Sequence, residues 1–289
     1  MIHNTFIPQK SLGQNWLVNP HILDKIITTA EINKNDIVVE IGPGLGNLSK
    51  KLAQRASKVI AVEKDSRLIN DLRILFKDSD NIDILEADAL KFDLQKYLSH
   101  TTYYIPHATS YKIVANIPYY ITSNFLRTIF EEWPQPKLIV LTIQKEVAQR
   151  IMAKPPHTNL LALSVQYYSE PEIISYVSRN NFRPVPKVDS AIIRLKPYYH
   201  EHHGRHSAHG KKLFELMRAG FSEKRKQLAP ILSKKLKLEK EKVLDAFQKS
   251  SIAPTARAEN LSLEQWQELT NLLIYPLKGT QERFAHSAN

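Results

Sequence analysis

The sequence predicts an α/β fold with a mainly parallel sheet, followed by a small all-helical domain. Three observations support this prediction. Short apolar strands alternate with helical patterns from residue 37 to about residue 195, which is typical of a parallel sheet covered on both faces. The first of these strands runs into a turn with three glycines at alternate positions. Beyond residue 210 the sequence contains helical patterns and no further strand pattern.

The individual elements follow from the periodicity of the apolar residues. A helix is predicted over 20–31, because Pro20 suits a first helical turn and Ile22, Ile26 and Ile27 share one face. Further helices are expected from Asn47 and over 67–76 and 123–131. We expect 165–168 and 191–195 to pair as antiparallel strands at one edge of the sheet. The predicted strands lie near residues 37–41, 58–62, 82–85, 111–115, 137–143, 161–168 and 189–195.

Five segments are expected along the chain. They are an N-terminal arm at 1–19, the α/β domain at 20–197, a histidine-rich hinge at 198–210, the helical domain at 211–275 and a tail at 276–289. The hinge contains five histidines, and we favour a flexible link over a metal site because no regular element fixes them. Ser262 with Gln265 resembles a capping box. Helices of the second domain are predicted over 211–220, 228–236, 239–248 and 263–273.

The composition favours a cytoplasmic protein with a polyanionic partner. The chain has 289 residues, a formal net charge of +11 and no cysteine, so it offers neither disulfides nor a thiolate metal site. Residues 205–242 hold 12 Lys and Arg against 4 Glu, so most of the excess positive charge lies there. A solvated helix face is the alternative explanation. We expect no secretory signal and no membrane span, because the longest strongly apolar run, 138–143, is too short.

The glycine turn has the properties of a ligand site. Glycine lets the backbone turn sharply and approach a ligand, and the helix that follows offers unpaired N–H groups. Glu63 ends the next strand about 20 residues after Gly42, where an acidic side chain suits a ribose. Three interpretations stay open at this point: a dinucleotide site, a methyl-donor site with Glu40 before the glycines, and a turn that binds nothing.

Two further strands end in candidate contacts. Asp88 follows the strand at 82–85 and is suited to accept from a donor's adenine amine, although a surface turn acid would look the same. Asn116, Ile117, Pro118 and Tyr119 follow the strand at 111–115. The Asn116 amide and a nearby main-chain carbonyl can both accept from one exocyclic amine, and Tyr119 can lie against a purine. All of these residues fall at the carboxyl ends of predicted strands, where open α/β sheets bind ligands.

Together these residues resemble the ribosomal RNA adenine dimethylases, and among them the branch that acts on the small subunit. The resemblance runs from about residue 9 to residue 273. It covers the glycine turn, Asn116 to Tyr119, and five further stretches at 12–17, 144–147, 182–190, 218–226 and 254–262. One departure is the absence of a Tyr-Gly pair before Leu163, which puts RNA docking near 153–159 in question but not the donor site.

The resemblance implies a Rossmann-like class I methyltransferase sheet with S-adenosylmethionine as the methyl donor. The donor contacts that it implies are Asn15, Leu17, Gly42, Glu63, Asp88 and Asn116. It also implies the substrate, two adjacent adenosines in the 3′-terminal hairpin loop of 16S rRNA, dimethylated at N6 within the immature small subunit. We expect a cytoplasmic monomer that needs no metal.

The mechanism expected from these residues is alignment of a weak nucleophile. Asn116 Oδ1 and the Ile117 carbonyl would each accept one N6–H, which would aim the nitrogen lone pair at the methyl group. Tyr119 and Phe182 would stack on the flipped adenine, although Phe182 before an Arg-Pro pair fits a core plug equally well. The helical domain would bind phosphates through Arg218, Lys224, Arg225 and Lys226.

Three other functions remain as alternatives to this hypothesis. The fold could serve a non-catalytic RNA-binding assembly factor or transcription accessory protein. A related methylase of large-subunit rRNA is an alternative of the same class, although 182–190 and 257–262 favour the small-subunit enzyme. A dinucleotide oxidoreductase fits least well.

Overall fold

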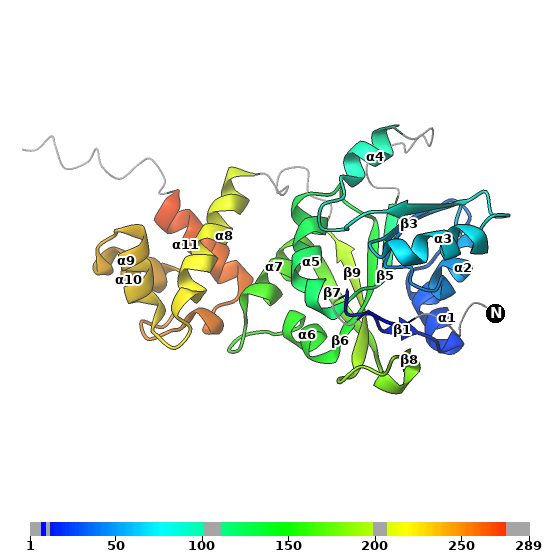
Figure 1. Ribbon diagram of the computed structural model, residues 1–289. Helices are drawn as coiled ribbons and strands as arrows, with labels where there is room; N and C mark the ends of the chain where they lie inside the picture. Colours follow the sequence, from blue (N-terminus) through cyan, green and yellow to red (C-terminus); the bar gives the residue numbers. More distant parts are fainter. Residues whose placement is uncertain (1–6, 10–11, 101–110, 199–206, 276–289) are drawn as a thin grey trace, which may run out of the picture. The chain divides into compact units, whose positions relative to one another are not determined.

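A seven-stranded sheet organises the first part of the chain (Figure 1). The computed structural model describes residues 7–9, 12–100, 111–198 and 207–275. The described residues of Met1–Met152 and Tyr168–Tyr199 form one compact unit, and those of Ala153–Tyr167 and His200–Asn289 form a second. The predicted tail and most of the predicted histidine-rich hinge lie outside the described residues.

The strand order confirms the predicted α/β sheet. The order is β4-β3-β2-β5-β6-β9-β7, in which β2 to β6 are parallel and β9 is antiparallel to both of its neighbours. The central strands are buried on both faces, as expected for near-continuous runs of Val, Ile and Leu. The strands are β2 Ile37–Ile41, β3 Lys58–Glu63, β4 Ile82–Glu86, β5 Tyr111–Asn116, β6 Leu138–Gln144, β7 Ser169–Val177 and β9 Ser190–Pro197.

The strand predicted at 161–168 is wrong, because Leu160–Tyr168 forms helix α7. Its residues are apolar on nearly all sides, and such a short run cannot be assigned by periodicity alone. The antiparallel partner of β9 at the edge of the sheet is instead β7, a strand that the sequence analysis missed. Pro171 and two glutamates weaken its strand pattern, yet Pro171 is tolerated because β7 lies at the sheet edge.

Helices follow the strands of the first unit and begin at recognisable caps. Asn19 caps α1 through a 2.9 Å bond from the His21 N–H, and Asp65 caps α3 through a 3.1 Å bond from the Arg67 N–H. A two-stranded antiparallel ladder, β1 Trp16–Leu17 with β8 Phe182–Arg183, ties the N-terminal arm to the main body. The helices are α1 Pro20–Thr29, α2 Asn47–Ala53, α3 Ser66–Leu75, α4 Leu94–His100, α5 Thr122–Glu131 and α6 Lys145–Ile151, with the 3-10 turns η2 Tyr119–Ile121 and η3 Arg179–Asn181.

The second unit is all-helical, as predicted from residue 211 onward. Trp266 is fully buried beside Gly220, and the predicted capping box of Ser262 and Gln265 is confirmed. Residues 153–167, which the sequence analysis placed in the α/β domain, belong to this unit because α7 packs there, with Tyr167 edge-on to Phe214. Its helices are α7, α8 Ala208–Gly220, α9 Leu228–Leu236, α10 Lys240–Lys249 and α11 Leu263–Ile274, with η4 Phe221–Glu223 and η5 Ala258–Asn260.

The topology determines where a ligand can bind. The chain moves outward from β2 to β4 on one side of the sheet and then returns to β5 on the other side of β2. A crevice therefore opens at the carboxyl ends of β2 and β5, which is where ligands bind in sheets of this kind. Within the described residues, no helix combines the length and apolar character needed to cross a bilayer.

Candidate active site

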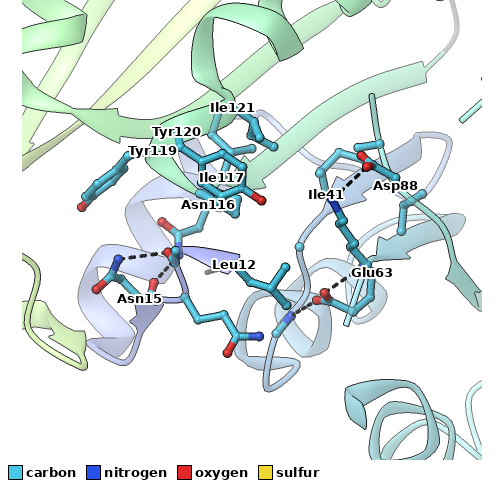
Figure 2. A pocket seen from close by; sticks show the side chains of 18 of the residues that line it. Leu12, Asn15, Ile41, Glu63, Asp88, Asn116, Ile117, Tyr119, Tyr120 and Ile121 are labelled. Atoms are coloured by element: carbon cyan, nitrogen blue, oxygen red, sulfur yellow. Dashed lines mark hydrogen bonds and ion pairs between the residues drawn. The ribbon is translucent and has the colours of Figure 1, made fainter. Parts of the chain in front are cut away.

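A pocket opens at the carboxyl edge of the sheet (Figure 2). It is built from the ends of four neighbouring strands and is closed on one side by the N-terminal arm. Seven residues predicted from the sequence line it: Asn15, Gly42, Glu63, Asp88, Asn116, Ile117 and Tyr119. The structure thus brings together side chains that lie up to 104 positions apart in the chain, as the strand-end argument predicted.

The glycine turn forms the floor of the pocket. Gly42 and Gly44 both have left-handed backbone conformations, with φ of +67° and +58°. A Cβ atom on Gly44 would lie 2.5 Å from Cδ1 of Trp16, so only glycine fits beneath this indole ring. A Cβ on Gly42 would lie 3.9 Å from the Asn116 carbonyl oxygen, an ordinary contact distance. The glycine turn therefore packs closely against the N-terminal arm at Gly44, whereas there is open space beside Gly42.

Glu63 fastens the glycine turn to the end of β3. Its Oε2 accepts a 3.1 Å bond from the Gly44 N–H, and its Oε1 accepts 2.8 Å bonds from the N–H groups of Lys64 and Asp65. Burial raises the pKa of this carboxyl above its ordinary value, although the three N–H donors offset part of the rise. A carboxylate accepts about four hydrogen bonds, so Glu63 retains acceptor capacity toward the pocket.

Asp88 is paired with a lysine that the sequence analysis did not select. Lys64 Nζ lies 2.9 Å from Asp88 Oδ2, and Asp88 Oδ1 accepts a 3.0 Å bond from the Leu90 N–H. Burial alone would raise the pKa of Asp88, but Lys64 and the Leu90 N–H outweigh it and hold the pKa below its ordinary value. Asp88 therefore presents a charged acceptor at the pocket wall, with an ammonium beside it.

Asn116 is held in one orientation by the N-terminal arm. Its Nδ2 donates a 3.0 Å bond to the Asn15 carbonyl oxygen, and Asn15 Nδ2 in turn donates to the Gly13 carbonyl oxygen at 3.1 Å (Figure 2). Because the amide nitrogen is engaged, Asn116 Oδ1 is left as an acceptor. Among the described residues, none donates a hydrogen bond to that oxygen.

The arm is tied down on the opposite side of the pocket as well. Gln14 Nε2 donates a 2.7 Å bond to Asp65 Oδ2, and Arg67 holds the pKa of Asp65 below its ordinary value. Gly13 packs against Tyr120, whose ring carbon Cδ1 would lie 3.1 Å from a Cβ at that position. Residues 12–16 therefore form a wall of the pocket.

Tyr119 is oriented by a hydrogen bond at the tip of its ring. Its hydroxyl lies 2.7 Å from Ser190 Oγ on β9, and burial raises the pKa of the phenol above its ordinary value. If the pocket carries the methyl transfer that the resemblance implies, we expect Tyr119→Phe and Ser190→Ala to lower its rate by similar small factors, about fivefold, because each removes one hydrogen bond. Tyr119→Ala should be much more severe, since it removes the ring. Single-turnover rates would check this, and equal losses in Tyr119→Phe and Tyr119→Ala would assign the role to the hydroxyl.

Two predicted residues do not line the pocket. Leu17 on β1 and Phe182 on β8 face each other across the two-stranded ladder, and both are buried in the hydrophobic core of the unit. Phe182 is completely buried, which fits a core plug rather than a stacking surface. The sequence analysis missed Trp16, Lys64 and Tyr120, which do line the pocket. Each of these three residues is next in sequence to a predicted site residue. That adjacency is the sequence signal that could have found them.

The four basic residues predicted to bind RNA lie in the second unit. Arg218 is in the last turn of α8, and Lys224, Arg225 and Lys226 follow η4. All four are exposed. Lys226 forms an ion pair with Glu223. Within the described residues, no group of three or more His, Asp and Glu side chains is arranged to hold a metal ion.

A buried carboxyl beneath the glycine turn makes stability depend on pH. Glu40 on β2 is 1% exposed, and burial raises its pKa to about 8, with the nearby Ser49 hydroxyl offsetting part of the rise. Because the folded-state pKa exceeds the ordinary value of 4.5, this stabilising protonation is complete below 4.5 and is lost as the pH rises through 8.

We therefore expect Glu40→Gln to remove this loss of stability. Relative to the wild type, the variant should gain up to about 5 kcal/mol in free energy of unfolding at pH 9 and little at pH 5. Urea unfolding at pH 5, 7 and 9 would measure the difference. Parallel stability curves for the two proteins would contradict the buried, protonated carboxyl.

Two solved structures resemble this fold over most of the chain. The 23S rRNA methyltransferase ErmE matches with a TM-score of 0.70 and 27% identity, over 90% of this chain and 100% of that chain. A dimethyladenosine transferase from Plasmodium falciparum matches with a TM-score of 0.70 and 31% identity, over 88% and 95%. The parallel sheet with its glycine turn, acidic strand ends and helical second unit defines a class I methyltransferase.

Sequence comparisons give the family. The chain belongs to the ribosomal RNA adenine dimethylase family, whose family model matches residues 6–274. Ribosomal RNA small subunit methyltransferase A of Dehalococcoides mccartyi is 40% identical over 94% of this chain and 89% of its own length. The protein of the same name from Lachnoclostridium phytofermentans is 39% identical over 94% of both chains. The chain is thus an rRNA adenine dimethyltransferase.

Proposed function

We propose that this enzyme transfers methyl groups from S-adenosylmethionine to N6 of two adjacent adenosines in the 3′-terminal hairpin loop of 16S rRNA. The observation that carries the proposal is the hydrogen bond from Asn116 to the Asn15 carbonyl, because it leaves Asn116 Oδ1 as an acceptor in the pocket. Relatives at about 40% identity that carry small-subunit names support this choice of rRNA.

The residues present fit S-adenosylmethionine, which when bound supplies a methyl group activated by its sulfonium. Gly42 leaves room above the floor of the pocket, and the Gly44 N–H is already held by Glu63, so the turn is preformed. We assign the ribose hydroxyls to the remaining acceptor capacity of Glu63 and the adenine amine to Asp88. Lys64 must yield part of its contact with Asp88 for this to occur.

The main contribution of Asn116 and Ile117 in our proposal is to align the adenine amine with the methyl group. An adenine amine is a weak nucleophile, because its lone pair is delocalised into the ring. Asn116 Oδ1 and the Ile117 carbonyl each accept one N6–H in our proposal, which favours a pyramidal nitrogen. Holding two reactants in attacking geometry can lower a barrier by ~7–11 kcal/mol in the best cases. The nitrogen becomes acidic after transfer, so its proton is lost without a dedicated base.

The target base must leave its stack to enter the pocket, which costs roughly a few kcal/mol. Tyr119 lines the pocket and offers an aromatic face to the base, and such stacking contributes about 1–3 kcal/mol per base. The buried position of Phe182 argues against a second stacking surface there. Exposed Tyr120, which also lines the pocket, is the better candidate for a second aromatic contact.

Dimethylation places a further demand on this geometry. After the first transfer the amine has one hydrogen left, so one of the two acceptors must make room for a methyl group. Asn116 is fixed by Asn15, whereas Ile117 lies in the turn before η2. We therefore assign the adjustment to the Ile117 carbonyl.

Phosphate contacts are proposed for the helical unit. Replacing Arg218, Lys224, Arg225 and Lys226 with glutamine should weaken binding to the small subunit and reduce the salt slope by about 0.7–0.9 for each phosphate that is no longer neutralised. Lys226→Gln alone should have less effect than Lys224→Gln, because Glu223 already neutralises Lys226. Filter binding across a range of salt concentrations, from about 50 to about 300 mM, would measure this. An unchanged slope would remove these residues from the RNA interface.

The direct test combines reaction and substrate. The purified protein would be incubated with S-adenosylmethionine and undermethylated small subunits, and the rRNA 3′ fragment analysed by mass spectrometry. We expect N6,N6-dimethyladenosine at two adjacent positions. Methylation of 23S rRNA instead would favour the large-subunit activity named for ErmE. Binding without methylation would favour a non-catalytic assembly factor.

We also propose that the enzyme acts as a monomer, in the cytoplasm, on the immature subunit. The absence of cysteine is compatible with a reducing compartment. Analytical ultracentrifugation would test the monomer, and comparison of immature with mature undermethylated subunits would test the substrate.

A further inference from the structure

A second pocket, open to solvent, lies on the first unit and is lined by charged side chains that the reaction does not use. It lies between α6 and the segment that joins β7 to β9. We call it the α6 groove. Its charged lining residues are Lys145, Glu146, Arg179, Lys187 and Asp189.

The α6 groove adjoins the active site through the strands of the sheet. Gln144, the last residue of β6, is in register with Ser190 on β9, and Ser190 Oγ contacts the Tyr119 hydroxyl at 2.7 Å. The Lys145 N–H donates a 3.0 Å bond to the Asp189 carbonyl oxygen, which closes one end of the groove. The groove therefore begins one residue beyond Gln144 of β6 and one residue before Ser190 of β9, the residue that contacts Tyr119.

Within the part of the chain that the structure describes, the cations of the groove are not neutralised by a carboxylate, although Arg179 Nη1 donates a 3.2 Å bond to the Lys187 carbonyl oxygen. Among the described ion pairs, none involves Lys145, Arg179 or Lys187. Asp189 Oδ1 accepts a 3.0 Å bond from the Arg179 N–H, so this carboxylate orders the loop. Lys145 Nζ lies 4.9 Å from the centroid of the Tyr176 ring, a cation–π contact that holds the ammonium in place.

The charges select the chemistry of the ligand. Three cations against two carboxylates leave a net charge of +1, which suits a phosphodiester with one charge per nucleotide better than a compact di- or triphosphate. Tyr176 is 52% exposed, and an aromatic ring beside cations is typical of surfaces that bind single-stranded RNA.

We propose that the α6 groove binds the phosphodiester backbone of the single-stranded RNA that flanks the target adenosine. The proposal rests on the proposed function, because a base flipped into the pocket leaves its flanking phosphates at the rim. The groove would then determine which loop nucleotide enters the pocket, in addition to contributing affinity.

The test compares two triple variants that remove the same number of charges. The first is Lys145→Gln with Arg179→Gln and Lys187→Gln. The matched control is Lys25→Gln with Lys50→Gln and Lys137→Gln, three exposed lysines of the same unit outside the groove. Binding would be measured on undermethylated subunits and on a naked 16S rRNA fragment that contains the 3′-terminal hairpin.

We expect the groove variant to lose about tenfold or more in affinity for both RNAs and to lower the salt slope by about 2, at roughly 0.7 for each of three single-stranded phosphate contacts. The control should change the slope far less. Equal losses in the two variants would overturn the proposal. A loss on subunits without a loss on naked RNA would also overturn it, because it would assign the groove to a ribosomal protein.

Two further measurements separate this proposal from the proposed function. S-adenosylhomocysteine affinity should be unchanged in the groove variant, which would show that the donor pocket is intact. A photo-crosslinking phenylalanine analogue at position 176 should crosslink to nucleotides flanking the target adenosines, and crosslinks elsewhere would overturn the proposed position. Crosslinking at the expected place by the position-176 variant, together with no methylation by the wild-type protein, would refute the proposed function and leave the groove assignment standing.

Discussion

Asn116→Ala is expected to lower the rate of methyl transfer by at least about 100-fold while donor affinity falls no more than about fivefold. The side chain provides the acceptor proposed to align the adenine amine, and its Nδ2 holds the arm through Asn15. Loss of the acceptor acts on the chemical step, whereas loss of the tie to Asn15 affects the donor pocket only modestly. Single-turnover kinetics and calorimetric titration with S-adenosylhomocysteine would measure the two effects.

Thr142→Val provides the matched control for Asn116→Ala. Thr142 is in register with Asn116 on the adjacent strand, is completely buried, and has a hydroxyl without a hydrogen-bond partner among the described residues. Its replacement keeps the volume and removes a polar group next to the site. We expect wild-type rates from this variant. A wild-type rate from Asn116→Ala would show that the alignment mechanism is incorrect.

Gly44→Ala is expected to lower the free energy of unfolding by about 2–4 kcal/mol and to weaken donor binding more than tenfold. The backbone is left-handed at this position, and the new methyl group would lie 2.5 Å from Cδ1 and 2.8 Å from Nε1 of Trp16. The backbone of Trp16 is fixed by its ladder with β8, so the indole ring would have to leave its position over the turn to make room. Urea unfolding and donor titration would give both quantities.

Gly42→Ala separates backbone strain from the clash with Trp16. Its φ of +67° is similar, but the nearest atoms to a Cβ are 3.9 and 4.0 Å away. The expected loss of stability is therefore the backbone contribution alone, about 1–2 kcal/mol. If the two alanine variants were equally stable, close packing of Trp16 on the turn would not be the reason for glycine at position 44.

The features that the sequence predicted correctly are those that depend on local pattern and on strand order. Glu63 and Asn116 end apolar strands and Asp88 follows one closely, and parallel strands bring such ends to one edge of the sheet. The capping box at Ser262 requires two side chains three residues apart, so it also is readable from the sequence. Neither the strand-end residues nor the capping box required knowledge of long-range packing.

The remaining features are decided by tertiary contacts. Whether Phe182 faces the pocket or the core depends on its pairing with Leu17, 165 residues earlier in the chain. Lys64 could be assigned to the site only once β3 and β4 were known to place it beside Asp88. The segment 160–168 is a helix where a strand was predicted, and tertiary contacts are again the reason. Its Tyr167 packs against Phe214 of the second unit, a contact that no local pattern reveals.

The contribution of residues 153–167 to the second unit has a consequence for protein engineering and for evolution by recombination. Thr158 donates to the Glu259 carbonyl, and Asn260 donates to the Pro156 carbonyl, so this internal segment completes the helical unit. A fragment that ends near residue 197 would carry α7 without α8 to α11 and would expose its apolar side chains. The helical unit is therefore not an interchangeable C-terminal module, and a functional chimera must exchange two separate stretches of sequence together.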